Sequence, residues 1–167
     1  MFIRTKNIKG HPYAYLVENT WKRESSRQKV SKYLGRVHIL AETGKTEAIK
    51  LDGLSYEESI KALMGAQLRS LGFVEKDNVL KHASLVFDSA TMTLKDSSST
   101  KSQVVKSNDG FVCDHTLAEL IAMKNTGNEQ EVGLCLAKAC VAAGLDIDKE
   151  QFVELYELLG ERKIDTH

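Results

Sequence analysis

The sequence predicts an α+β fold, and three features of its pattern support that class. Residues 1–38 are rich in aromatic and β-branched residues separated by turn signals. Residues 39–113 combine one clear helix with short strand-like runs, and residues 114–167 repeat apolar positions at helical spacing. With 167 residues, 42% hydrophobic and 28% charged, the chain is typical of globular proteins with one ordinary core or two small ones. We expect neither wholesale disorder, nor a collagen-like polymer, nor an integral membrane protein.

The first segment, residues 1–38, is predicted to be a basic three-stranded antiparallel meander. Its strands are expected at Phe2–Ile8, Tyr13–Thr20 and Arg27–His38. The first connection contains Gly10 and Pro12, which are typical turn residues, and residues 21–26 form a polar second connection. Strict alternation places Tyr13, Tyr15 and Val17 on one face of the second strand. On the third strand it places Val30, Lys32 and Leu34 opposite Lys29, Ser31 and Tyr33. The pattern leaves the register of the pairing open.

The second segment, residues 39–113, is predicted to mix a helix with antiparallel strands. The helix spans Ser55–Leu71, because Ser55 and Glu58 form a capping box and Gly72 ends the apolar stripe. Four strand-like runs follow it: Val79–His82, Ser84–Asp88, Thr91–Lys95 and Gln103–Lys106. The turn residues 107–110 then predict a hairpin into Phe111–Cys113.

The third segment, residues 114–167, is predicted to be helical and to pack on the middle region. Three helices are expected, at Thr116–Lys124, Asn128–Ala143 and Asp148–Leu159. Thr116 with Glu119 is interpreted as a capping box, and Asn128 as a helix cap. Each helix is too short to be stable alone, so each is expected to pack against the sheet of the middle region.

The net charge of zero conceals a strong asymmetry along the chain. Residues 1–38 hold nine Lys or Arg and two Glu, a net charge of +7, and the remaining residues carry −7. Such a split indicates an end that faces a polyanion, with the rest of the chain as a counterweight. Three partners remain open: nucleic acid, an acidic protein, and the acidic part of this same chain.

The candidate binding site lies on the predicted meander. Nucleic acid requires cations that replace phosphate counterions and, for single strands, aromatic platforms on which bases stack. Tyr13 and Tyr15 are assigned either to base stacking or to the core of the sheet, and the sequence does not decide between them. The proposed nucleic-acid-binding residues are Arg4, Lys6, Tyr13, Tyr15, Arg27, Lys29, Lys32 and Arg36.

No catalytic, cofactor or metal site is predicted. Gly44-Lys45-Thr46 resembles the end of a phosphate-binding loop, but Ile39 stands where that loop needs its first glycine. Cys135 and Cys140 diverge on a predicted helix and are expected to be core residues, together with neighbouring apolar side chains. We therefore predict a protein that is not an enzyme. Three cysteines without disulfide spacing and no apolar leader favour a cytoplasmic location.

Residues 1–36 resemble the N-terminal segment of a group of insertion-sequence transposases. That segment follows the pattern F-[IV]-R-x-K…YYYLVE…R…[RK]Q+x-x-KYLG. The resemblance covers about a fifth of the chain and implies that this module contacts DNA. The chain is too short for the transposase catalytic domain. The matching positions are Phe2, Ile3, Arg4, Lys6, Tyr13, Tyr15, Leu16, Val17, Glu18, Arg27, Gln28, Lys29, Lys32, Tyr33, Leu34 and Gly35.

Together these patterns predict a non-enzymatic protein that binds nucleic acid, DNA in particular, through its basic N-terminal sheet. The alternative is a protein–protein adaptor or self-associating regulator whose basic sheet docks on an acidic surface, including that of a second copy. Strandedness, sequence specificity and oligomeric state remain open.

Overall fold

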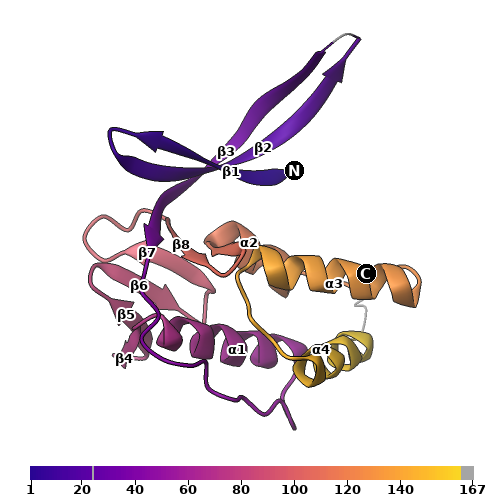
Figure 1. The fold of residues 1–167 in the computed structure, drawn as a ribbon. Coiled ribbons are helices and arrows are strands. Elements are labelled where there is room, and N and C mark those ends of the chain that lie inside the picture. The colour runs from indigo at the N-terminus through magenta and orange to yellow at the C-terminus, as the bar shows by residue number, and fades with distance from the viewer. Residues whose placement is uncertain (24, 163–167) are drawn as a thin grey trace.

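The structure is a computed structural model that describes residues 1–23 and 25–162, except for the side chain of Lys22. It confirms the α+β class: the described residues form two sheets and four helices (Figure 1). The strands are β1 (Phe2–Ile8), β2 (His11–Lys22), β3 (Ser25–Ile39), β4 (Val74–Lys76), β5 (Val79–His82), β6 (Leu85–Asp88), β7 (Thr93–Asp96), β8 (Gln103–Ser107) and β9 (Gly110–Val112). The helices are α1 (Tyr56–Ser70), α2 (Asp114–Ile121), α3 (Glu129–Ala142) and α4 (Lys149–Glu161).

The predicted N-terminal meander is present, but it belongs to a larger sheet. Strands β1, β2 and β3 pair antiparallel in sequence order, and β3 then pairs parallel with β8, which pairs with β9. Gly35 permits this junction, because a side chain there would meet the backbone of Ser102 and Gln103. The predicted polar connection at residues 21–26 is wrong, since β2 runs to Lys22 and β3 begins at Ser25.

The second sheet is a four-stranded antiparallel meander in the order β4-β5-β6-β7. Three of its strands match the predicted runs to within two residues, and the predicted hairpin between β8 and β9 is confirmed. Strand β4 was not predicted. It pairs with β5 across a tight turn in which Asp77 and Asn78 both have positive φ, a conformation that Asn and Asp tolerate well.

Local capping signals set the starts of three helices. Ser55 and Glu58 form the predicted capping box of α1, and equivalent boxes at Asn128 and Asp148 start α3 and α4. The prediction that Thr116 caps the second helix is wrong, because α2 begins two residues earlier, at Asp114. The Thr116 hydroxyl lies inside the first turn, where it donates to the Phe111 carbonyl oxygen over 2.6 Å.

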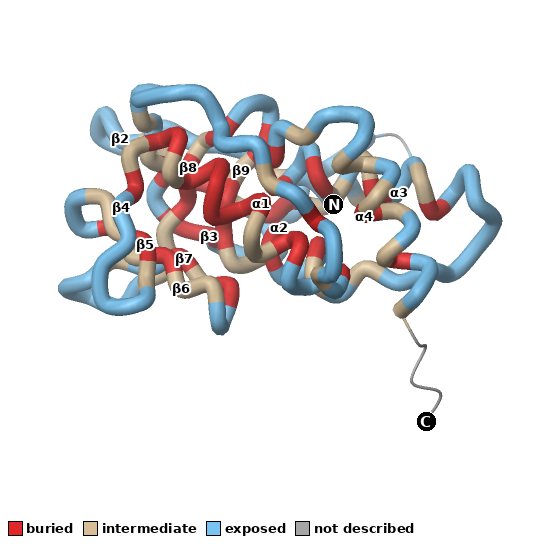
Figure 2. The backbone as a smooth tube through the Cα atoms, turned by 90° about the horizontal axis from the view of Figure 1, so that it is seen from below, coloured by how far each residue is buried: buried red, intermediate tan, exposed pale blue. Residues whose placement is uncertain are grey.

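The main core joins α1, the four-stranded sheet and the C-terminal helices, as the buried segments of Figure 2 show. Helices α2 and α4 contact α1, and α2 and α3 also contact β9. Hydrogen bonds hold the ends of these elements together. The Tyr56 hydroxyl donates to the Leu120 carbonyl, and the Arg162 guanidinium donates to the carbonyls of Ile121 and Met123.

A second, smaller core lies beneath the N-terminal strands and joins them to β8 and the start of α2. It is a distinct cluster, separate from the main core, and it buries apolar side chains from β2, β3 and β8. Its buried members are Ala14, Leu16, Leu34, Val37, Val104 and Cys113.

The end of α3 lies directly on the turn between β8 and β9. Ser107 and Asn108 both donate side-chain hydrogen bonds to the Gly144 carbonyl, over 2.8 and 2.9 Å. Gly110 lies against the backbone of Val141, so this contact has no room for a side chain. In the described part of the chain, no helix is long and apolar enough to cross a bilayer.

Candidate nucleic-acid interface

The candidate interface lies on β1, β2 and β3, at the end of the molecule opposite α1 and α4 in Figure 1. Strands β1 and β2 are joined by Lys9 and Gly10, which have φ values of 50° and 82°. Two consecutive positive φ values are typical of the turn that matches the twist of a two-residue hairpin. The turn fixes the pairing of Ile8 with His11, and with it the register of the whole hairpin.

The register gathers five of the eight predicted residues on one face. Residues that pair directly across antiparallel strands point to the same side of a sheet. One row across the strands pairs Lys6 with Tyr13 and Tyr13 with Arg36; the next pairs Arg4 with Tyr15 and Tyr15 with Tyr33. We call this set the tyrosine face: Arg4, Lys6, Tyr13, Tyr15, Tyr33 and Arg36.

Tyr33 joins this face because of two irregularities in the pairing of β2 with β3. The register shifts between Ala14 and Tyr15, and again between Leu16 and Val17, so that Leu34 and Ser31 of β3 are left without a direct partner. Each extra residue reverses the alternation that follows it. The predicted alternation of the third strand was therefore wrong: Tyr33 shares a face with Val30, not with Lys29.

The three tyrosine rings of this face form one cluster. The ring centroid of Tyr33 lies 5.3 Å from that of Tyr15 and 6.3 Å from that of Tyr13, within the range of favourable aromatic pairs. Partial burial raises the pKa of Tyr33, and the neighbouring phenols of Tyr13 and Tyr15 raise it further. Tyr33 remains 52% exposed. The cluster therefore presents a ring to solvent between flanking cations.

The structure separates the tyrosines from the core of the sheet. Leu16 and Ala14 point to the opposite side of β2 from Tyr13 and Tyr15, and they are buried in the small core. Tyr13 and Tyr15 are half-buried and are not members of either core. Each of the two rings packs against Tyr33 on the other face of the strand pair, away from the small core.

The other three predicted cations lie on the opposite face of the strand pair. Lys32 pairs with Leu16, Lys29 with Glu18, and Arg27 with Thr20. Near the body this face covers the small core, but farther along the strands all three cations are exposed. The predicted residues therefore form two groups on two faces, not one surface.

None of the six predicted cations forms an ion pair with a described residue. Arg4 instead donates to the side chain of Gln28, and the Arg36 guanidinium lies 3.0 Å from His11 Nδ1. The ion pairs of the described residues all lie in the body: Lys61 with Glu57, Arg69 with Glu75, Lys81 with Asp77, and His115 with Glu119. Within residues 1–23 and 25–162, no carboxylate of the body is ion-paired with these six cations.

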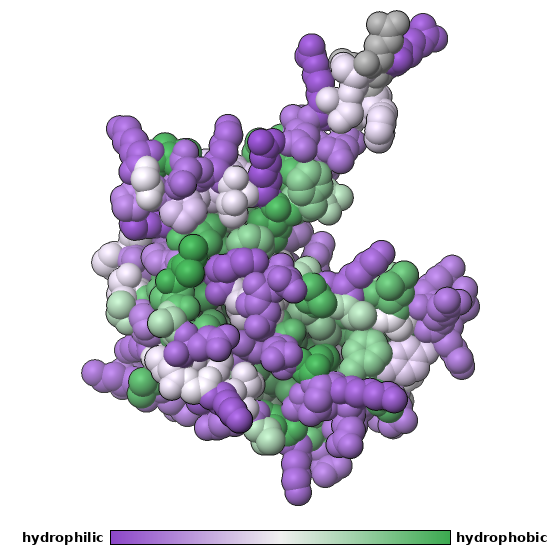
Figure 3. Space-filling model, viewed as in Figure 1, coloured by the Kyte–Doolittle hydropathy of each residue, from purple (hydrophilic) through white to green (hydrophobic). Residues whose placement is uncertain are grey.

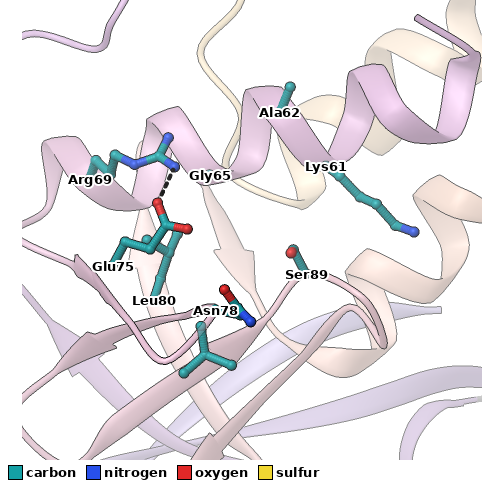
Figure 4. A pocket seen from close by; sticks show the side chains of 9 residues that line it. Lys61, Ala62, Gly65, Arg69, Glu75, Asn78, Leu80 and Ser89 are labelled. Carbon is teal, nitrogen blue, oxygen red and sulfur yellow. Dashed lines mark ion pairs between the residues drawn. The ribbon is translucent and has the colours of Figure 1, made fainter.

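A pocket elsewhere in the molecule differs from the tyrosine face in the pairing of its cations. It lies between α1 and the four-stranded sheet, with a volume of about 240 Å³, and Lys61, Arg69 and Glu75 contribute to its lining (Figure 4). The Arg69 guanidinium is 3.7 Å from the Glu75 carboxylate, and Lys61 is paired with Glu57. Both cations at this pocket are thus already neutralised, unlike those of the tyrosine face.

The cysteines differ from one another in exposure. Cys113 and Cys140 are buried, as a core role requires, but Cys135 is exposed, so its assignment to the core was wrong. It lies on the outer side of α3, where Leu134 is also exposed. Within residues 1–23 and 25–162, no group of three His, Cys, Asp or Glu side chains is arranged to hold a metal ion.

We expect Cys135 to be the one cysteine of the native protein that reacts rapidly with Ellman's reagent. Burial raises the pKa of Cys113 and raises that of Cys140 to about 12, which removes the reactive thiolate at neutral pH. Titration should count one fast thiol in the native state and three in denaturant. Cys135→Ser should abolish the fast phase, and rapid reaction of that variant in the native state would contradict the assignment.

Comparisons with protein-family models, with curated proteins and with solved structures gave no match. The resemblance of residues 1–36 to transposase N-terminal segments therefore stays a prediction from the sequence.

Proposed function

We propose that this chain binds nucleic acid, without catalysing a reaction, through the basic N-terminal sheet. The observation that supports the proposal most is the state of its cations: Arg4, Lys6, Arg27, Lys29, Lys32 and Arg36 are exposed, and none is paired with a carboxylate of the described residues. Unpaired cations attract a polyanion because they release its counterions. The sequence resemblance points to DNA, and the cysteine pattern to the cytoplasm.

The tyrosine face supports the same proposal through its chemistry. Tyr33 offers an aromatic surface between Arg4 and Arg36, and bases stack on such rings while arginines hold the phosphates. The tyrosines are held in place by one another, so a ligand would meet a rigid platform. Protein partners can also contact tyrosine and arginine, and the salt dependence of binding separates the two cases.

A salt series with Lys29→Ala tests the proposal. Neutralisation of six phosphates predicts that log K for duplex DNA falls with log salt at a slope of about −5. Lys29→Ala should weaken binding and reduce that slope by about one unit, because one phosphate contact is lost. The matched control is Lys50→Ala, which removes another exposed lysine, from the segment between β3 and α1. Gel shifts across the salt series measure both slopes.

The adaptor alternative predicts a different result in the same measurement. A basic sheet that docks on acidic protein would give no shift with DNA or RNA at any salt concentration. It would instead give a larger particle in size-exclusion chromatography as concentration rises, through contact with the acidic body of a second copy. That pair of results would overturn the proposal.

A further inference from the structure

The outer part of the β2–β3 hairpin, residues 18–32, extends from the body as a two-stranded arm. Figure 1 shows the two strands leaving the sheet side by side, and Figure 3 shows the same segment standing clear of the molecule. We call it the β2–β3 arm. None of its described residues is buried, and among the hydrogen bonds of the described side chains only that from Arg4 to Gln28 joins the arm to another element.

Two apolar side chains of the arm are exposed on the same face. Trp21 is 85% exposed and Val30 is 53% exposed. The register pairs Trp21 with Ser26, Asn19 with Gln28, and Val17 with Val30, so these residues share a side of the arm. An isolated two-stranded hairpin is only marginally stable in water. A bound partner that covers Trp21 would supply the apolar contact that the rest of the chain does not.

The net charge of the arm indicates that this partner is negatively charged. Residues 18–32 contain five Lys or Arg and two Glu, a net charge of +3. Arg27 and Lys29 lie on one face, and the neutral hydrogen-bonding groups of Asn19 and Gln28 lie on the other. A partner that fits both faces must carry negative charge for the cations of the arm. It must also offer hydrogen-bonding groups and apolar surface for the face that carries Asn19, Gln28 and Trp21.

The groove of a nucleic-acid duplex combines charged phosphates at its borders with hydrogen-bonding base edges at its floor. The width of the groove then determines whether a DNA or an RNA duplex can admit the arm. Two paired strands lie about 4.8 Å apart, and the major groove of B-form DNA, about 12 Å wide, admits such a ribbon. The major groove of A-form RNA is too deep and narrow, and a single strand has no groove. Asn and Gln side chains bond adenine edges in the major groove, and Arg and Lys reach the phosphates that border it.

We propose that the β2–β3 arm inserts into the major groove of double-stranded DNA, with Trp21 and Asn19 toward the base edges. Arg27 and Lys29 contact the bordering phosphates. The Arg4 guanidinium donates to the Gln28 side chain, which places one cation of the tyrosine face beside the arm. The inference rests on the proposed function and adds its substrate class and its mode of contact.

Trp21 is the only tryptophan of the chain, so its fluorescence reports on the arm directly. Duplex DNA should shield the indole from acrylamide several-fold, and duplex RNA of the same sequence should not. Methylation of guanine N7, which lies in the major groove, should weaken binding of the full chain. Equal shielding by both duplexes, or no effect of N7 methylation, would overturn the groove assignment.

Two variants separate this inference from the proposed function. Trp21→Ala should weaken binding to duplex DNA about tenfold, and binding to single-stranded DNA by less than twofold. The control is Val74→Ala, which truncates another exposed apolar residue, on β4. Replacement of residues 19–28 by Asn-Gly, which joins the paired positions Glu18 and Lys29, should have a larger effect in the same direction. Unchanged duplex binding by both variants would overturn the inference alone. Absence of binding by the unmodified chain to any nucleic acid would overturn the proposed function as well.

Discussion

Gly110→Ala is expected to cost about 4 kcal/mol or more of the free energy of unfolding, enough to unfold many proteins of this size. A Cβ atom at this position would lie 2.0 Å from the Val141 carbonyl oxygen and 2.6 Å from both the Ala142 oxygen and the Gly144 nitrogen. All three are backbone atoms at the end of α3, so no side-chain rotation relieves the overlap. Strand β9 would have to separate from the helix. Denaturant titration followed by circular dichroism measures the loss.

The matched control for this prediction is Gly44→Ala. No heavy atom lies within 4 Å of a Cβ built on Gly44, and its φ lies outside the left-handed region. Alanine there should change the free energy of unfolding by less than about 0.5 kcal/mol. If Gly110→Ala unfolds at the same denaturant concentration as Gly44→Ala, the close contact between β9 and α3 is absent in solution.

The parts of the fold that the sequence predicted depend on local interactions. The box of Ser55 with Glu58 joins residues three positions apart, and so does the bond from Glu131 N to Asn128 Oδ1. Such pairs are visible in the sequence because both partners lie in one short window. The start of α2 was missed because its N-cap residue is Cys113, and cysteine is not a typical capping residue. The Thr116 hydroxyl lies in the first turn, where it accepts from the Cys113 N–H and donates to the Phe111 carbonyl oxygen.

The parts that could not be predicted depend on contacts between distant segments. Pairing of β3 with β8 joins Arg36 to Gln103, and nothing near either residue indicates the other. The irregular pairing of β3 with β2 is also invisible in the sequence; it places Leu34 in the small core while Tyr33 stays beside Tyr15. Exposure of Cys135 likewise depends on which side of α3 meets the body.

The sequence predicted which residues form the candidate site, but not how they are arranged in space. Basic and aromatic residues in one segment indicate a polyanion, and the eight chosen residues do lie on β1, β2 and β3. Their division into the tyrosine face and the opposite face follows from the register, which the sequence left open. The β2–β3 arm was not predicted, because the polar residues 21–26 are typical of a loop. In the structure, however, strand pairing continues through Trp21 and Ser26.

The combined variant Arg27→Ala/Lys29→Ala/Lys32→Ala is expected to lower the affinity for duplex DNA a hundredfold or more at about 0.1 M salt. Loss of three phosphate contacts should also flatten the salt dependence by about three units. These side chains are exposed and none is ion-paired with a described residue, so the variant should unfold at the same denaturant concentration as the natural chain. Gel shifts or anisotropy titrations at several salt concentrations measure the effect.

The control for this variant must remove the same charge from another part of the chain. Lys45→Ala/Lys50→Ala/Lys149→Ala does so with three exposed lysines, two between β3 and α1 and one at the start of α4. Because both variants have a net charge of −3, any difference between them reports position and not overall charge. Equal losses of affinity in the two variants would mean that the whole molecule's charge governs binding and that the N-terminal sheet is not the contact surface. A loss confined to the first variant would assign the phosphate contacts to these three side chains of β3, none of which is ion-paired with a described residue.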